Sequence, residues 1–163
     1  MICVLHGYCL GLAIDIACAT DIRISTSDAT FSVKEVDMGL AADIGTLSRL
    51  PKITGSQSWV KDVCLSARPF YPDEALRVGF VSEVQDSKDS ALRRGIEIAS
   101  VLAEKSPVAV QGTKALINYS AGRSVSDGLR YTQVWNSAAL QASDLPISMT
   151  AATQKRTPKF EKL

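Results

Sequence analysis

The chain has 163 residues, 46% of them hydrophobic, and its 18 lysine and arginine residues nearly balance its 17 aspartate and glutamate residues. This length matches one domain of ordinary size, which buries roughly two thirds of the surface that the unfolded chain exposes. Charges of both signs are interspersed, so the sequence offers no basic face for nucleic acid or for an anionic membrane surface. The longest apolar run, residues 9–19, contains Asp15 and is too short to span a bilayer. We therefore expect neither nucleic acid nor a membrane as a partner.

Hydrophobic periodicity predicts strands and helices in alternation through the first part of the chain. The expected strands cover residues 2–6, 21–25, 30–33 and 81–84. The expected helices cover residues 12–20, 55–64 and 71–78, and a further helix begins near Thr46. Glycine-containing stretches at residues 7–11 and 39–45 predict a turn and a loop.

The character of the sequence changes after Ser87. Apolar residues at helical spacing predict helices over residues 90–103 and 124–142. A third helix opens at Ser106-Pro107, where proline suits the first turn. A β-rich part followed by helices predicts an α/β fold, with a core over residues 1–86 and a helical region over residues 87–163.

The four cysteines show neither a C-x-x-C pair nor a zinc-binding spacing. Three of them lie in apolar runs, which predicts reduced packing residues of an intracellular protein. The first residues after Met1 form a strand pattern, with no signal peptide or presequence before it. Because a core strand needs neighbours on both sides, we expect the natural protein to have more chain before Met1.

Three carboxylates, Glu35, Asp37 and Asp43, stand close together in an apolar stretch, and Asp15 lies upstream. Apolar surroundings disfavour the charged form of a carboxylic acid, which suits proton transfer at neutral pH. An ordinary surface segment is the alternative, in which the acids face solvent and Lys34 pairs with Glu35. A third interpretation is a hard divalent cation bound by Glu35, Asp37 and Asp43. It is disfavoured because the stretch lacks the spacing of a calcium loop.

A glycine-containing turn joins the first expected strand to the first expected helix, in the sequence HGYCLGLAID. Backbone N–H groups at a helix N-terminus carry partial positive charge and can stabilise a developing oxyanion. Asp15 falls about one turn inside this helix, where a favourable interaction with the helix dipole is the alternative explanation. His6 is the sole histidine of the sequence, and we assign it no role.

Four stretches carry a family resemblance: HGYCLGLAIDIACATDIRI, FSVKEVDMGLAADIGTLSRLPKITG, ARPFYPDEALRVGFVSEV and KSPVAVQGTK. Their order and spacing resemble the enoyl-CoA hydratase/isomerase (crotonase) superfamily. Within it, KEVDMGLAADIGTLSRLPK is most similar to the Δ3,5-Δ2,4-dienoyl-CoA isomerases of fatty-acid β-oxidation. The resemblance implies a crotonase-like ββα superhelix. Residues 1–86 would be the C-terminal part of its core, and residues 87–163 would cover the site and mediate oligomerisation.

The resemblance also implies roles for individual residues. Asp15 and Glu35 match the two acid/base carboxylates of the hydratases, and Asp43 matches the third carboxylate that distinguishes the dienoyl isomerases. Glu35 and Asp43 would exchange protons at the two ends of the diene, and Asp15 would support their protonation states. Leu12 stands where the family has a glycine whose backbone N–H binds the oxyanion, so Leu12 and Gly11 are assigned to substrate binding. The second oxyanion donor and much of the coenzyme A surface lie in an N-terminal portion of the family that this chain does not contain.

The implied activity is conversion of a 3,5-dienoyl-CoA to a 2,4-dienoyl-CoA, with no metal and no cofactor beyond the coenzyme A of the substrate. Alternatives are an enoyl-CoA hydratase, a Δ3,Δ2-enoyl-CoA isomerase, or an inactive truncated assembly partner. Asp37 matches no catalytic position of the family and is left structural. The family forms trimers or paired trimers, so we expect a homotrimer or hexamer. Apolar residues of the helical region suit that assembly or an internal core, namely Leu129, Val134, Trp135 and Leu140.

The chain ends in Glu161-Lys162-Leu163, which resembles the peroxisomal Ser-Lys-Leu address. Glutamate replaces the small residue that this address prefers at its first position. A peroxisomal location is our first expectation. A mitochondrial location is the alternative, since a presequence would lie in the missing N-terminal portion.

Overall fold

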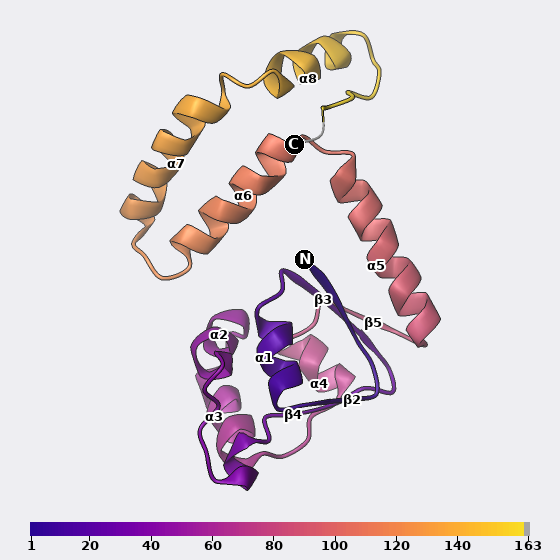
Figure 1. The fold of residues 1–163 in the computed structure, drawn as a ribbon, viewed down its shortest axis with the longest axis vertical. Helices are drawn as coiled ribbons and strands as arrows, with labels where there is room; N and C mark the ends of the chain where they lie inside the picture. Colours follow the sequence, from indigo (N-terminus) through magenta and orange to yellow (C-terminus); the bar gives the residue numbers. More distant parts are fainter. Residues whose placement is uncertain (162–163) are drawn as a thin grey trace. The chain divides into compact units, whose positions relative to one another are not determined.

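The computed structural model describes residues 1–161. Within these residues it contains the strands β1–β5, the 3-10 helix η1 and the α-helices α1–α8 (Figure 1). The chain divides into two compact units, the first from Met1 to Glu97 and the second from Ile98 onward. No helix among the described residues is long and apolar enough to cross a membrane.

The first unit holds all five strands and most of the short helices. Its strands are β1 (Ile2–Leu5), β2 (Tyr8–Leu10), β3 (Ile22–Thr26), β4 (Thr30–Ser32) and β5 (Glu83–Gln85). Its helices are α1 (Leu12–Cys18), η1 (Glu35–Met38), α2 (Thr46–Ile53), α3 (Gln57–Ser66) and α4 (Pro72–Arg77), and α5 (Lys88–Ala103) begins in it. The second unit contains α6 (Pro107–Ser120), α7 (Val125–Ala139) and α8 (Asp144–Thr153).

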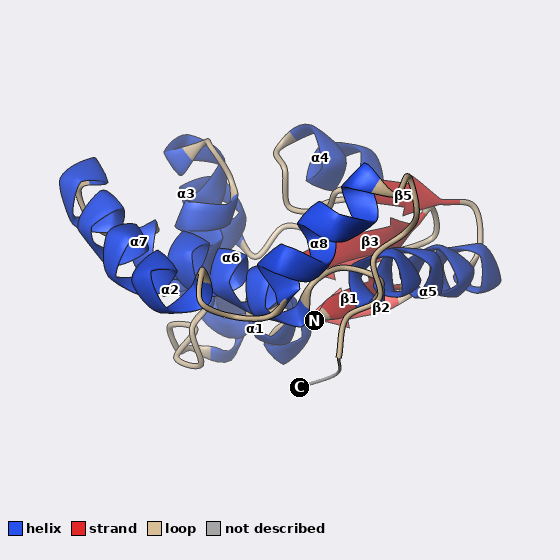
Figure 2. Cartoon of the chain, turned by 90° about the horizontal axis from the view of Figure 1, so that it is seen from above, coloured by secondary structure: helices blue, strands red, loops and turns tan. Residues whose placement is uncertain are grey.

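The strands form two small parallel sheets. In the first, shown in Figure 2, β3 lies between β1 and β5, with Ile2 opposite Ile22 and Ile24 opposite Glu83. In the second, β2 pairs with β4. Parallel neighbours need a crossover connection, and the segment through β2 and α1 supplies it between β1 and β3. Helix α1 therefore begins two residues after the end of β2, at the edge of the short β2–β4 sheet.

Three phenylalanines form the centre of the first unit. Phe31, Phe70 and Phe80 are completely buried, and the ring centroids of Phe31 and Phe70 are 5.2 Å apart. Phe31 and Phe70 also exchange two backbone hydrogen bonds, of 3.0 and 2.9 Å. This pairing holds the segment after α3 against β4. It fixes the end of β4, from which the chain runs directly into η1.

The predicted strands and helices recur in the structure with shifted ends, but the turn expected over residues 7–11 is wrong, and two helices, η1 and α8, were not predicted. Residues 7–11 were expected as a turn, yet Tyr8–Leu10 is a strand, because it pairs with β4 from further along the chain. The helix expected over residues 124–142 ends at Ala139, and α8 follows as a separate helix. Pro146 lies in the first turn of α8, where its missing N–H is tolerated, whereas it could not continue α7.

The second unit is a helical hairpin with α8 appended. Helices α6 and α7 lie side by side in Figure 1, and the rings of Tyr119 and Tyr131 stack between them at 4.0 Å. Among the described residues of this unit, only Gly112, Gly128 and Ala151 are buried. A cavity of about 330 Å³ lies among the three helices, lined in part by Trp135. This unit therefore has little core of its own.

Candidate active site

Asp15 is a buried carboxylate that connects two helices. It lies on α1 with 2% of its surface exposed, and its Oδ1 accepts a hydrogen bond of 2.6 Å from the backbone N–H of Thr46. Thr46 is the first residue of α2, and Gly45 before it has no side chain to cap the helix. Asp15 thus supplies from α1 the negative acceptor that an N-terminus favours. The sequence indicated an interaction of Asp15 with the dipole of its own helix, α1. In the structure Asp15 also lies at the N-terminus of α2.

Glu35 is the second buried carboxylate. It opens η1 with 7% of its surface exposed, and its Oε2 has no hydrogen-bond partner among the described residues. Its Oε1 lies 3.2 Å from the place where a Cβ on Gly11 would be. Gly11 has φ +53° and donates its N–H to the carbonyl of Ser32 across 2.9 Å. The glycine therefore turns the chain and leaves room for the Glu35 carboxylate.

Asp43 is exposed, on the loop that follows Gly39 and ends at Gly45. Asp37 is also exposed, and its Oδ2 accepts from Lys34 Nζ at 2.7 Å. Pairing of Lys34 with Glu35 is therefore wrong, because η1 turns Asp37 toward the lysine. The surface interpretation holds for Asp37 and Asp43, whereas Glu35 is buried.

Gly11 and Leu12 lie where the sequence placed the candidate oxyanion site. Leu12 is the first residue of α1, and its side chain is 56% exposed. The first N–H groups of a helix have no partner within it, and here the N–H of Ile14 turns back to the Gly11 carbonyl at 2.8 Å. Leucine adopts the helical start without disturbing the chain. A backbone donor at Leu12 is compatible with this geometry.

Large apolar side chains remain exposed on the elements that carry the acids. They belong to β2, to α1, to η1 and the loop after it, and to α2. They are Tyr8, Leu10, Leu12, Ile16, Met38, Leu40, Ile44 and Leu47. Exposed apolar side chains in such number mark a surface that binds an apolar ligand or another part of a protein.

Two other sequence hypotheses concern ligands and reactive groups. The described residues contain no group of three or more His, Cys, Asp or Glu side chains that could hold a metal ion. His6 is exposed, and its carbonyl oxygen accepts from Cys9 Sγ. The four cysteines are free thiols, three of them buried. Burial raises the pKa of Cys18 to about 12, which makes it a packing residue at neutral pH.

Thr46 is the site residue that sequence reasoning missed. Its position at a helix start was anticipated, but its bond to Asp15 spans a sequence separation of 31. Its hydroxyl oxygen is buried with no partner among the described residues, like Glu35 Oε2. Most buried polar groups in proteins are hydrogen-bonded, so each of these two oxygens is a candidate to bind a ligand. The only sequence signal was a threonine directly after a glycine at a helix start.

Comparison with known proteins identifies relatives of this chain. The family model described as enoyl-CoA hydratase/isomerase matches residues 1–162. The chain is 48% identical to the mitochondrial Δ3,5-Δ2,4-dienoyl-CoA isomerase of Mus musculus, over 100% of this chain and 51% of that protein. It is 45% identical to the peroxisomal enzyme of that name from Arabidopsis thaliana, over 100% of this chain and 58% of that protein.

The fold has solved counterparts. The crystal structure of an enoyl-CoA hydratase/isomerase from Mycobacterium paratuberculosis superposes with a TM-score of 0.91 at 25% identity, over 98% of this chain and 60% of that one. The chain spans about half the length of the curated relatives that it matches. The match of the family model to nearly the whole sequence, together with this fold, shows that the chain belongs to the enoyl-CoA hydratase/isomerase family.

Proposed function

We propose that this chain carries the carboxylates of a Δ3,5-Δ2,4-dienoyl-CoA isomerase that acts in fatty-acid β-oxidation. The observation that supports it most is the Glu35 carboxylate, which is buried, faces Gly11 and keeps one oxygen unpaired. A carboxylate in this state can take up or release a proton without first breaking a protein hydrogen bond. Asp43 supplies a second, exposed carboxylate on the loop after η1. Relatives at 45 to 48% identity bear the name of this enzyme.

The reaction needs two proton transfers and no change in electron count. A carboxylate removes a proton from C2 of the 3,5-dienoyl thioester, and the electron pair delocalises onto the thioester oxygen. A second carboxylic acid then delivers a proton to C6, and the double bonds come to rest at positions 2 and 4. Because C2 and C6 are far apart, we assign one transfer to Glu35 and the other to Asp43.

The remaining site residues act through position. The Leu12 N–H would donate to the thioester oxygen as negative charge develops there, with Gly11 shaping the approach. Asp15 would support the protonation states of the other two acids, and its hydrogen bond to Thr46 holds the start of α2, where the Asp43 loop ends. The coenzyme A of the substrate supplies the thioester, so the proposed chemistry uses neither a metal nor a redox cofactor.

The helical region over residues 87–163 would cover the site and assemble the protein into a homotrimer or hexamer. Apolar side chains on its helices are exposed in the single chain, including Leu129, Val134 and Leu140. Trp135 is half-buried against Gly112. These exposed residues suit contact with another surface.

For location we propose the peroxisome, with the mitochondrion as the alternative. The Arabidopsis relative is named as peroxisomal and the mouse relative as mitochondrial. The last two residues of the Glu161-Lys162-Leu163 ending lie outside the described residues.

The proposed function is tested with a purified protein and a 3,5-dienoyl-CoA, by the ultraviolet absorbance of the conjugated 2,4-dienoyl product. The chain of 163 residues is assayed beside a version extended at its N-terminus. We expect Asp43→Asn to lower kcat by about 100-fold or more, because one of the two proton transfers is lost. Asp37→Asn is the matched control, since Asp37 is a nearby exposed acid paired with Lys34, and it should keep the wild-type kcat. Unchanged turnover in Asp43→Asn would overturn the assignment.

A hydratase is the second candidate function. The chain is 30% identical to the short-chain-enoyl-CoA hydratase of Clostridium acetobutylicum, over 96% of this chain. Asp15 and Glu35 are both buried and would suffice for the carboxylate pair of such an enzyme. Hydration of a 2-enoyl-CoA that survives Asp43→Asn would favour this candidate over the isomerase.

A further inference from the structure

A single arginine ties the loop that carries Asp43 to the helix that follows it. Arg49 lies on α2, and its Nη1 donates to the carbonyl oxygen of Ile44 across 3.2 Å. Its backbone N–H donates to the carbonyl of Gly45 across 3.0 Å. The side chain therefore turns back toward the start of its own helix. It holds the loop at the residue directly after Asp43.

Gly45 makes this contact possible. It has φ +138°, a conformation that side chains rarely allow, and a Cβ built there would lie 1.9 Å from Arg49 Nη1. The guanidinium group therefore occupies the space that any other residue at this position would fill. Because Gly45 has no side chain, it can adopt this backbone conformation and also leave room for the Arg49 guanidinium group.

The same short segment is also held from inside the protein. The N–H of Thr46 is bonded to the buried Asp15 carboxylate at 2.6 Å. We call the hydrogen bond from Arg49 to Ile44 the outer tie and the hydrogen bond from Thr46 to Asp15 the inner tie. The two bonds flank Gly45. The backbone just after Asp43 is thus fixed at two points, from opposite sides.

Stability alone does not explain the outer tie. Arg49 is exposed, and an exposed hydrogen bond competes with water and adds little to the free energy of unfolding. The hydrogen bond from Arg49 instead restrains a loop that has no regular secondary structure. This loop carries the exposed Asp43 carboxylate, which contacts the substrate in the proposed reaction. Errors of about 1 Å in the position of a catalytic group can cost about 100-fold in rate.

We propose that Arg49 is a positioning residue, which braces the Ile44–Gly45 backbone and so sets the place of the Asp43 carboxylate. This role rests on the proposed function, because the carboxylate that it positions is the one assigned to a proton transfer. In this proposal Arg49 acts through the backbone of the loop, by its hydrogen bond to the Ile44 carbonyl, and not by contact with the substrate.

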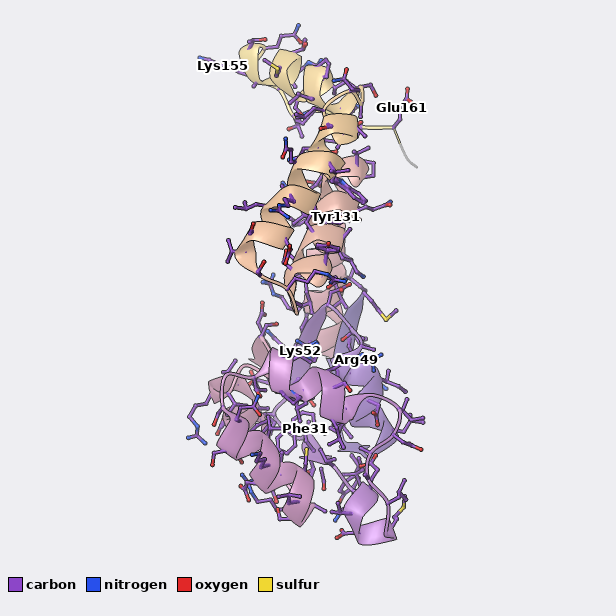
Figure 3. The ribbon with its side chains drawn as sticks, turned by 90° about the vertical axis from the view of Figure 1, so that its left-hand side faces the viewer. Phe31, Arg49, Lys52, Tyr131, Lys155 and Glu161 are labelled. Atoms are coloured by element: carbon purple, nitrogen blue, oxygen red, sulfur yellow. The ribbon has the colours of Figure 1, made fainter. Side chains whose placement is uncertain are left out.

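The test compares Arg49→Met with Lys52→Met. Both residues lie on α2, as Figure 3 shows, and both are exposed. Methionine keeps a long side chain but removes the donors. Amide hydrogen exchange of residues 43–46 is measured in the 163-residue chain, and kcat and KM are measured in the form that turns over a 3,5-dienoyl-CoA.

For Arg49→Met we expect exchange at Thr46 to quicken by about ten-fold or more, because loss of the outer tie lets the loop open locally. We expect kcat to fall by about ten- to 100-fold while KM stays near the wild-type value. The midpoint of urea unfolding should be unchanged. Lys52→Met should match the wild-type protein in every measurement.

A second variant, Gly45→Ala, tests the same contact by filling the space that the Arg49 guanidinium group occupies. The new Cβ would displace the Arg49 guanidinium, so exchange at Thr46 should quicken as it does in Arg49→Met. In the double variant the two effects should be less than additive, because the displaced group is already gone. Fully additive effects would contradict a shared brace.

Three results would overturn the proposal. They are unchanged exchange in Arg49→Met, faster exchange with unchanged kcat, and a raised KM at constant kcat, which would make Arg49 a substrate-binding residue. If the wild-type protein does not isomerise the diene in either form, the proposed function fails. The exchange data then decide by themselves whether Arg49 braces the loop.

Discussion

Two glycines flank β2 with nearly the same positive φ and different surroundings. Gly7 has φ +58° and Gly11 has φ +53°. A Cβ at Gly7 would meet nothing within 4 Å, whereas one at Gly11 would lie 3.2 Å from Glu35 Oε1. Substitution at Gly7 therefore tests the strain of a positive φ alone, whereas substitution at Gly11 adds contact with the buried Glu35 carboxylate.

We expect Gly7→Ala and Gly11→Ala each to lower the free energy of unfolding by about 1–3 kcal/mol, because both have a positive φ that a residue with a Cβ rarely adopts. Only Gly11→Ala should also lower kcat, because it displaces Glu35. Urea unfolding and turnover of a 3,5-dienoyl-CoA measure the two effects. Equal losses of kcat in both variants would show that the turn, and not the carboxylate contact, is what activity requires.

At the scale of elements, the decisive contact joins α1 to α2. The first residue of α2 gives its N–H to Asp15, and Gly45 cannot cap the helix in its place. A buried N–H left without an acceptor costs the desolvation of that group. The start of α2, and with it the loop that bears Asp43, therefore depends on a carboxylate from another helix.

We expect Asp15→Ala to lower the free energy of unfolding by about 1–3 kcal/mol, because the N–H of Thr46 loses its acceptor. Asp15→Asn keeps a carbonyl oxygen at the same place and should lose less. Urea unfolding of the two variants measures the difference. Equal destabilisation would mean that the negative charge, and not the acceptor, holds α2 in place.

At the scale of the whole molecule, the two units differ in how much they bury. The first unit has a continuous core around Phe31, Phe70 and Phe80, and it contains all four cysteines. Burial raises the pKa of each of these thiols, most clearly for Cys18, from 9.0 to about 12. The second unit buries few residues among those described and relies on contacts between its helices.

These thiols predict how the stability of the protein changes with pH. The folded state keeps the Cys18 thiol neutral up to about pH 12, whereas the unfolded chain ionises near 9.0. Unfolding therefore releases a proton above pH 9, and the free energy of unfolding falls by up to about 1.4 kcal/mol per pH unit from this group. Urea unfolding between pH 8 and 11 measures the slope. Cys18→Ala should show a smaller slope, and an identical slope would contradict the assignment.

The sequence by itself determined the order of strands and helices, the family resemblance and the set of acids, because these depend on local periodicity and on motifs along the chain. One expectation failed where distant pairing decides, because β2 forms only where β4 lies beside it. Helix α8 was not predicted, although Pro146 suits its first turn. Sequence also could not tell which acid is buried.

Only the tertiary structure decided the state of each carboxylate. It buried Asp15 against Thr46 and Glu35 against Gly11, and it left Asp43 exposed on a loop held by Arg49. The physical reason is that burial and hydrogen bonding depend on partners brought together from distant positions in the sequence, as with Asp15 and Thr46. Local composition gives the same apolar neighbours to all the acids of this stretch, and only packing separates them.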